Sequence, residues 1–257
     1  MAACGALSTL AVTEEGVLWA WGAGDDAQLG ISTREPRVMP TRVGGGEVFG
    51  GAGVVMAAAG ECHAAATTEE GHLWTWGDGE HGQLGQGDVE PRQAPSRVIV
   101  GVGADGSVLG WGRVVMVACG NLHTLVLTAD GKVWSCGCGS WGRLGLGDTR
   151  DRHTPTLVRP NELFGGATIV MVAAGASHSA SVSSEGDVWC WGCGREGCLG
   201  ANVEDSLVPR QVGRDKLPAA VVMVAAGRAH TLSVADDGGL WAWGCGGYAF
   251  LAADMLY

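Results

Sequence analysis

The residues of this chain with the clearest potential for chemistry are its glycines, cysteines and histidines. The stretch WGDGEHGQLGQGD contains a G-x-G-x-x-G pattern at Gly77, Gly79 and Gly82, which in dinucleotide-binding proteins cradles a pyrophosphate. That role needs a helix directly after the glycines, because amides at the helix N-terminus hold the phosphate. Here two more glycines follow within a few residues and disfavour a helix. The pattern therefore predicts a turn, and we predict no cofactor.

The cysteines also form pairs that occur in metal and redox sites. Cys190 and Cys193 form a C-x-x-C, and Cys136 and Cys138 a C-x-C, but no second C-x-x-C completes a set of four zinc ligands. The nine cysteines are an odd number, and the N-terminal residues lack the basic region of a secretory signal. The sequence therefore favours reduced thiols, a cytoplasmic or nuclear location, and no bound metal.

Four histidines end a recurring G-x-x-H motif: His63, His123, His178 and His230. The recurrence fits either a ring of metal ligands or four copies of one structural hydrogen bond. Zinc ligands must lie about 2.0–2.3 Å from one ion, and we expect equivalent positions of successive repeats to lie much farther apart. The histidines are therefore interpreted as structural.

No arrangement of residues typical of catalysis is found in the sequence. Several serines lie close to His178, but strand alternation would place them on different faces, and there is no G-x-S-x-G motif. The acidic residues are scattered through turn-like segments, where solvation and turn capping explain them. We therefore expect that the chain is not an enzyme.

These motifs recur in the same order along the chain, which indicates internal repeats. The G-x-x-H motif, or its variant G-x-x-S, begins at Gly5, Gly60, Gly120, Gly175 and Gly227, each time after an apolar run such as MVAAG. We interpret residues 1–257 as one repeat domain, whose approximate units are 1–55, 56–115, 116–170, 171–222 and an incomplete 223–257. The second unit carries an insertion at 100–114, expected to be a simple loop or a decayed repeat fragment.

Within each unit the hydrophobic period is two, which is typical of β-strands. Asp130-Gly131 and its equivalents suit tight hairpin turns, so each unit offers four short antiparallel strands, the number in one blade of a β-propeller. Most units also contain W-x-W, which places two indoles on one strand face. We expect these indoles to pack neighbouring blades together, with an aromatic ligand platform as the alternative. The structural tryptophan positions are Trp76, Trp134, Trp191 and Trp243.

The ordered series of G-x-x-H, an apolar strand and D/E-G-x-x-W-x-W-G-x-G-x-x-G-x-L-G-x-G-D resembles the repeat of the regulator of chromosome condensation family. The resemblance covers essentially the whole chain and implies an all-β propeller, commonly of seven blades. Five units leave two alternatives, a small closed ring or a partial arc with seven-bladed curvature. We expect the arc, and we expect its open ends to self-associate because they expose apolar blade faces.

The resemblance implies three kinds of function: nucleotide exchange on the small GTPase Ran with chromatin docking, modules of large ubiquitin ligases, and the plant ultraviolet-B photoreceptor. A net charge of −11 disfavours nucleic acid as a partner. The photoreceptor has tryptophans beside the G-x-x-H histidine, whereas this chain has other residues there, such as Glu61 and Cys62. No apolar run is long and uninterrupted enough to span a membrane.

The sequence is therefore interpreted as a protein–protein interaction scaffold that uses propeller faces and loops, within a larger regulatory or ubiquitin-ligase-type protein. Guanine nucleotide exchange on a Ran-like small GTPase is the alternative, with the 100–114 insertion as the projecting element that exchange requires. Turn residues of the repeats are the candidate partner-binding residues: Glu61, Asn121, Ser177, Arg228, Glu80, His81, Trp141 and Arg195.

Overall fold

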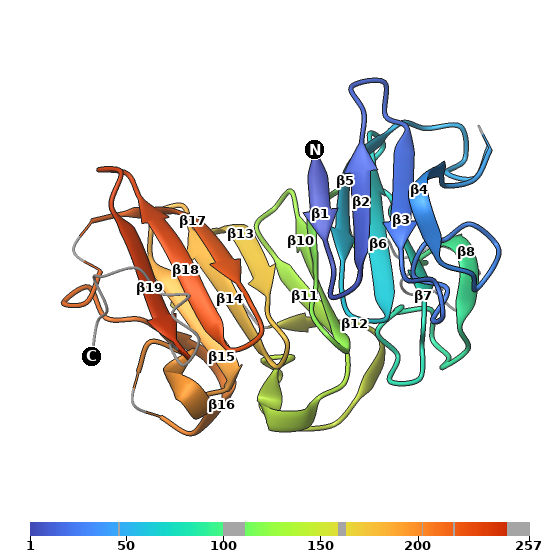
Figure 1. Ribbon diagram of the computed structural model, residues 1–257. Helices are drawn as coiled ribbons and strands as arrows, with labels where there is room; N and C mark the ends of the chain where they lie inside the picture. The colour runs from blue at the N-terminus through green and yellow to red at the C-terminus, as the bar shows by residue number, and fades with distance from the viewer. Residues whose placement is uncertain (46, 100–110, 159–162, 202, 218, 246–257) are drawn as a thin grey trace.

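The computed structural model describes residues 1–45, 47–99, 111–158, 163–201, 203–217 and 219–245, and these residues form five antiparallel β-sheets (Figure 1). The first sheet comprises β1 (Ala2–Cys4), β2 (Ser8–Val12), β3 (Leu18–Gly22) and β4 (Arg37–Arg42). The second comprises β5 (Val54–Ala59), β6 (His63–Thr68), β7 (Leu73–Gly77) and β8 (Arg92–Arg97). The third comprises β9 (Val114–Cys119), β10 (His123–Thr128), β11 (Val133–Gly137) and β12 (Arg152–Val158).

The last two sheets follow the same plan. The fourth comprises β13 (Ile169–Ala174), β14 (His178–Ser183), β15 (Val188–Cys193) and β16 (Asp205–Gln211). The fifth comprises β17 (Val221–Ala226), β18 (His230–Ala235) and β19 (Leu240–Gly244). Two short 3-10 turns, η1 (Ser140–Gly142) and η2 (Arg195–Gly197), lie in the loops after β11 and β15. Each sheet is one blade, so the predicted all-β propeller architecture is confirmed. The second to fifth sheets each begin two residues before the approximate start of the predicted repeat.

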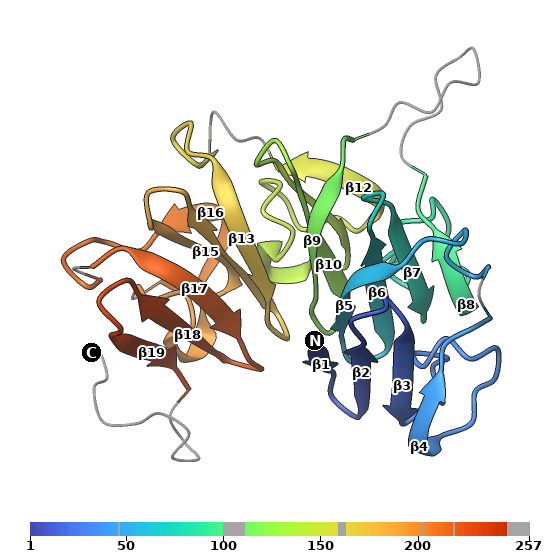
Figure 2. The same ribbon diagram turned by 90° about the horizontal axis from the view of Figure 1, so that it is seen from above.

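The blades follow one another along an open arc (Figure 2). The second strand of each blade packs on the first strand of the next, as β2 does on β5 and β14 on β17. No comparable packing joins β17 to β1 among the described residues. Of the two expected arrangements, the described chain therefore has the partial arc and not the closed ring.

The second strands of the middle blades are buried on both faces because a neighbouring blade covers each side. All residues of β6, β10 and β14 are buried. In β6 and β14 most side chains are small, as in HAAATT, which lets the blades approach closely. The hairpin turns beyond these strands use glycine at positive φ, for example Gly131 at 77°, as the Asp-Gly pattern predicted.

One backbone carbonyl in each of the first four blades serves as the docking point for the next blade. Trp76 Nε1 donates to Gln28 O, Trp191 Nε1 to Arg143 O and Trp243 Nε1 to Cys198 O, each at 2.9 Å. The glycine two residues after the carbonyl, such as Gly30, is in direct contact with the indole. A Cβ at Gly30, for instance, would come within 2.7 Å of Trp76 Nε1. This contact explains why a glycine recurs at that position of the repeat.

Trp134 occupies a different repeat position from Trp76, Trp191 and Trp243. It occupies the position of Trp74, the first indole of W-x-W, and is half-buried. The buried docking position of the third blade is taken by Cys136, whose Sγ lies 3.7 Å from Gln83 O. The third blade has W-x-C in place of W-x-W, so the thiol of Cys136 makes the inner contact. Trp134, the first residue of the motif, packs at the outer part of the junction.

The last residues of the insertion belong to the core. Trp111 packs edge-on against Trp134 with ring centroids 5.9 Å apart, as Phe49 packs against Trp74 and Phe164 against Trp189 at 5.6 Å. Residues 111–113 have no regular secondary structure, as a loop predicts, but Trp111 also contributes to the core, because an apolar residue fills the space between the blades. Residues 100–110 lie outside the described residues.

Candidate protein-binding face

Two sets of turns lie side by side on one face of the arc. The G-x-x-H turn opens the second strand of a blade and the glycine turn closes the third, and antiparallel pairing of His63 with Gly77 brings the two turns to the same end. The Asp78 amide donates to Cys62 O at 3.0 Å, and the equivalent bond joins Cys193 to Ser177 at 2.9 Å. We call the surface made by residues 60–62, 78–82 and their equivalents the glycine-turn face.

All eight candidate partner-binding residues lie on this face and are at least partly exposed. Glu61, Asn121 and Arg228 line a cavity of about 510 Å³ at the centre of the arc, together with the glycines of the G-x-x-H turns. Ser177 lies in the same ring of turns but does not line the cavity. The outer group comes from the glycine turns: Glu80, His81, Trp141 and Arg195.

The glycines around this cavity are required by close approach of the backbone. A Cβ at Gly60 or Gly120 would clash with the carbonyl oxygen of the corresponding glycine in the next blade. The same closeness allows the Ala6 amide to donate to Gly60 O at 3.2 Å. The backbone of these turns therefore forms much of the cavity wall, and Glu61 and Arg228 are its charged lining residues.

Trp141 is the most distinctive residue of the outer group. Its side chain is 38% exposed, and its backbone is left-handed at φ 58°, a conformation that bulky residues rarely adopt. The Arg143 guanidinium lies over the indole, 5.0 Å from the ring centroid. Arg143 is itself 2% exposed and donates to Ala176 O and Ser140 O at 3.2 Å. A rigid, buried arginine thus supports an exposed aromatic ring.

Acidic residues of the glycine turns pair with arginines of the same loop. Asp148 Oδ2 accepts from Arg152 at 2.8 Å, and Asp88 Oδ2 accepts from Arg92 at 2.6 Å. The hydrogen bond from Arg152, together with that from the Arg150 amide, lowers the pKa of Asp148 to about 2. These carboxylates hold the turn, in agreement with their interpretation as capping residues.

Three of the four repeated histidines make one recurring hydrogen bond between blades. Nε2 of His63, His123 and His178 lies 2.8–2.9 Å from the hydroxyl of Thr124, Ser179 and Thr231 in the next blade. Each hydroxyl donates in turn to the docking carbonyl, as Thr124 does to Gln83 O at 2.7 Å. The hydroxyl must therefore accept from Nε2–H, which places a proton on Nε2 of each ring.

Burial keeps these rings neutral. It lowers the pKa of His63 and His178 to about 4 and that of His123 well below its usual value. For His230, at the end of the arc, the described residues provide no hydrogen-bond partner for the imidazole, which is half-buried, and its structural role stays a prediction. In the first blade Ser8 replaces the histidine, and Ala64 replaces the facing hydroxyl.

Comparison with protein families supports the repeat interpretation directly. A model of the regulator of chromosome condensation (RCC1) repeat matches residues 15–67, 70–127, 130–182 and 185–234. The chain belongs to the RCC1 repeat family. A second RCC1 repeat model matches residues 56–83, 114–142, 169–198 and 221–249.

Relatives of the chain include proteins with different names and sizes. The ultraviolet-B receptor UVR8 of Arabidopsis thaliana is 35% identical over 245 residues, which cover 95% of this chain and 52% of the receptor. The human E3 ubiquitin-protein ligase HERC2 is 34% identical over 241 residues, covering 91% of this chain and 5% of the ligase. The chain thus spans about half of the receptor and a small part of the ligase.

Solved structures of RCC1 relatives share the fold. Human WBSCR16 superposes with a TM-score of 0.81 and 26% identity, covering 95% of this chain and 61% of the other. Prp20p from Saccharomyces cerevisiae superposes with a TM-score of 0.74 and 26% identity, covering 93% and 57%. The structure of Prp20p was described together with its binding to Gsp1p and histones.

The cysteines of the RCC1 repeats are free thiols, including the C-x-x-C pair Cys190 and Cys193. Burial raises the pKa of Cys62, Cys136 and Cys198 to about 12, so these thiols are poor nucleophiles at neutral pH. Ser179, the serine next to His178, is committed to Arg143 O at 2.8 Å. In the part of the chain that the structure describes, no helix is long and apolar enough to cross a membrane.

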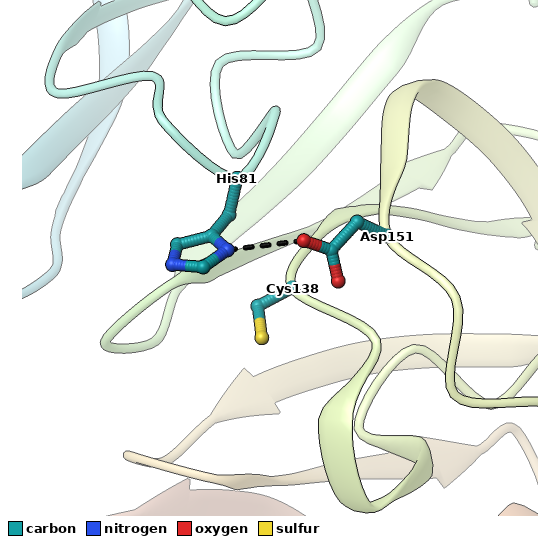
Figure 3. A group of neighbouring side chains, drawn as sticks. All are labelled: His81, Cys138 and Asp151. Atoms are coloured by element: carbon teal, nitrogen blue, oxygen red, sulfur yellow. Dashed lines mark hydrogen bonds and ion pairs between the residues drawn. The ribbon is translucent and has the colours of Figure 1, made fainter.

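One side-chain cluster on the glycine-turn face was not found from the sequence. His81, from the second RCC1 repeat, meets Cys138 and Asp151 from the third (Figure 3). His81 Nδ1 lies 3.0 Å from Asp151 Oδ2. The Gly139 amide donates to Asp151 Oδ1 at 2.9 Å, and these bonds lower the pKa of Asp151 although burial opposes the shift. Residues this far apart give no local signal, so only the packing of adjacent blades reveals the cluster.

Proposed function

We propose that this chain is a protein–protein interaction scaffold that binds its partner on the glycine-turn face, as part of a larger regulatory or ubiquitin-ligase-type protein. Prp20p, a relative with the same fold, was described with its binding to two kinds of protein, and HERC2 carries a similar segment within a ubiquitin ligase. The chain's net charge of −11 disfavours nucleic acid as the partner. A cytoplasmic or nuclear location remains a prediction from cysteine usage.

Trp141 is the observation that carries this proposal. Binding energy at protein interfaces concentrates in a few residues, among which tryptophan and arginine are enriched. An exposed indole in a left-handed conformation costs about 1–3 kcal/mol of backbone strain. Glu196, the equivalent residue of the fourth blade, has the same left-handed backbone at φ 67°, so the conformation belongs to the turn, and the exposed indole is the feature particular to the third blade. The Arg143 contact orders the ring before binding, which reduces the entropy lost on association.

Replacing Trp141 with glycine tests the proposed anchor. Glycine accepts positive φ, so we expect the thermal stability of Trp141→Gly to stay close to that of the wild type. Affinity for a partner identified by crosslinking should fall by about 2 kcal/mol or more, the range of hot-spot residues. Calorimetric titration of the partner into wild type, Trp141→Gly and Lys132→Ala measures the three affinities. Lys132 is an exposed hairpin residue on the opposite side of the blade, so its change is the control. Equal affinity of all three proteins would refute the glycine-turn face as the binding surface.

Nucleotide exchange on a Ran-like small GTPase is the alternative function, because the family resemblance includes exchange factors. We expect no acceleration of labelled GDP release from a panel of small GTPases by the isolated chain. A clear acceleration, reduced by changes on the glycine-turn face, would replace the scaffold proposal with exchange activity.

We also propose that the ends of the arc associate with each other between copies. In later blades, a hydroxyl such as that of Thr124 and an indole such as that of Trp76 contact the preceding blade. Thr9 and Trp21 hold the equivalent positions in the first blade, and both are half-buried. His230, at the other end, stands where a histidine meets such a hydroxyl. The fifth blade of one copy is therefore complementary to the first blade of another, a heterologous contact.

Sedimentation velocity on the isolated chain tests this association. We expect the sedimentation coefficient to rise with concentration, and Trp21→Arg to reduce the rise because a charge is costly to bury in the contact. A compact monomer at every concentration would contradict association through the ends.

A further inference from the structure

The cluster of His81, Cys138 and Asp151 has the composition of a metal site. One ligand atom from each residue, the imidazole nitrogen, the thiol sulfur and a carboxylate oxygen, lies within 4.8 Å of the other two. Tetrahedral zinc holds such ligands at about 2.0–2.3 Å, so small side-chain rotations would close the set around one ion. A mixed nitrogen, sulfur and oxygen set suits zinc, whereas calcium and magnesium prefer oxygen alone.

The backbone on both sides of the cluster is firmly placed. The His81 amide donates to Gln83 Oε1 at 2.9 Å, and the Cys138 amide donates to Leu122 O at 2.8 Å. Asp151 uses Oδ1 for the Gly139 amide, which leaves Oδ2 turned toward His81. To bind an ion, the Cys138 thiol would give up one weak hydrogen bond, which it donates to Ser140 Oγ at 3.4 Å. Outer-shell bonds of this kind orient ligands in known metal sites.

We propose that His81, Cys138 and Asp151 bind a zinc ion that joins the second and third blades. The Cys138 thiol releases its proton to solvent on binding, so a thiolate and a carboxylate balance the charge of the ion. Water fills the fourth position, because His81 and Asp151 are about one-third exposed, with side-chain exposures of 36% and 35%. Figure 3 shows His81 and Asp151 facing each other from two blades, with Cys138 beside them.

The next junction of the chain provides an internal comparison. Cys193 and Asp205 occupy the positions of Cys138 and Asp151, and Asp205 accepts from the Gly194 amide at 3.1 Å. Trp141, however, stands in the place of His81 and offers no ligand. Cys193 and Asp205 therefore lack a third ligand at their junction. At the preceding junction, His81 adds that third ligand to Cys138 and Asp151.

Titration of the reduced chain with cobalt(II), a spectroscopic substitute for zinc, tests the proposal. We expect one equivalent of cobalt to produce a thiolate-to-cobalt charge-transfer band, which one equivalent of zinc chloride abolishes. Removing a ligand should weaken binding by more than the roughly 10–100-fold that loss of an outer-shell partner costs. The variants are Cys138→Ser, His81→Ala and Asp151→Asn, the last of which keeps an acceptor for Gly139.

Cys193→Ser is the matched control and should bind cobalt like the wild type. Zinc should also raise the melting temperature of the wild type and of Cys193→Ser, but not that of Cys138→Ser. Because His81 is a surface residue, His81→Ala should melt like the metal-free wild type, which separates loss of metal from loss of fold. Absence of the band, its persistence in Cys138→Ser, or its loss in Cys193→Ser would overturn the proposal, since the last two outcomes place the metal on other thiols.

Discussion

Replacing Trp76 with alanine is expected to lower the free energy of unfolding by about 3–5 kcal/mol, the range for a large aromatic residue removed from a packed core. Trp76 is fully buried, lies against Gly30 and Phe49, and donates to Gln28 O of the preceding blade at 2.9 Å. The change leaves a cavity between the first and second blades and a buried carbonyl without its donor. Urea denaturation followed by tryptophan fluorescence and circular dichroism measures the effect.

Trp21 is the matched control for this prediction. It holds the same repeat position in the first blade, but the described residues place no blade before it, and it is half-buried. Trp21→Ala should therefore cost clearly less than Trp76→Ala. If the two variants were equally destabilised, or if Trp76→Ala melted like the wild type, the indoles would not be packing blades together, and the interpretation as a ligand platform would be favoured.

Lowering the pH from 7 to 5 is expected to destabilise the chain by about 2 kcal/mol for each of His63 and His178, at 1.36 kcal/mol per pKa unit. Burial lowers the pKa of each ring from 6.5 to about 4. The unfolded chain therefore binds protons first as the pH falls through 6.5, while the folded chain stays neutral until about pH 4. The stability contributed by the neutral rings is present above pH 6.5 and is lost progressively across this window.

The first junction of the chain provides the control for the pH dependence. There Ser8 and Ala64 replace the histidine and the hydroxyl, so the double variant His63→Ser, Thr124→Ala reproduces at the second junction a pair that the fold already accepts. Its unfolding free energy, measured by urea denaturation between pH 7 and pH 5, should fall less steeply than that of the wild type. An unchanged slope would show that other groups take up the protons. Asp148 does not interfere, since a pKa of about 2 moves its effect to more acidic pH.

The sequence alone predicted the repeats, the strands, the hairpins and, through the family resemblance, the propeller. These features depend on neighbouring residues, because strand alternation and the positive φ of a residue such as Gly131 are local properties. It also favoured a structural role over metal binding for the G-x-x-H histidines, since we expect a motif that recurs once per blade not to converge on one ion. The turn residues of the motifs supplied the candidate partner-binding residues, whose role stays a prediction.

The tertiary structure decided what the repeats do to each other. His63 bonds Thr124, Trp76 bonds Gln28, and His81 meets Asp151, contacts between residues 48 to 70 positions apart. Only blade-to-blade packing could show that Trp134 lies in the outer position, that Trp111 replaces a phenylalanine of the core, or that the described chain forms an open arc. The physical reason is that the pattern of one repeat specifies its own sheet, whereas curvature and side-chain clusters between blades depend on how two such sheets pack face to face.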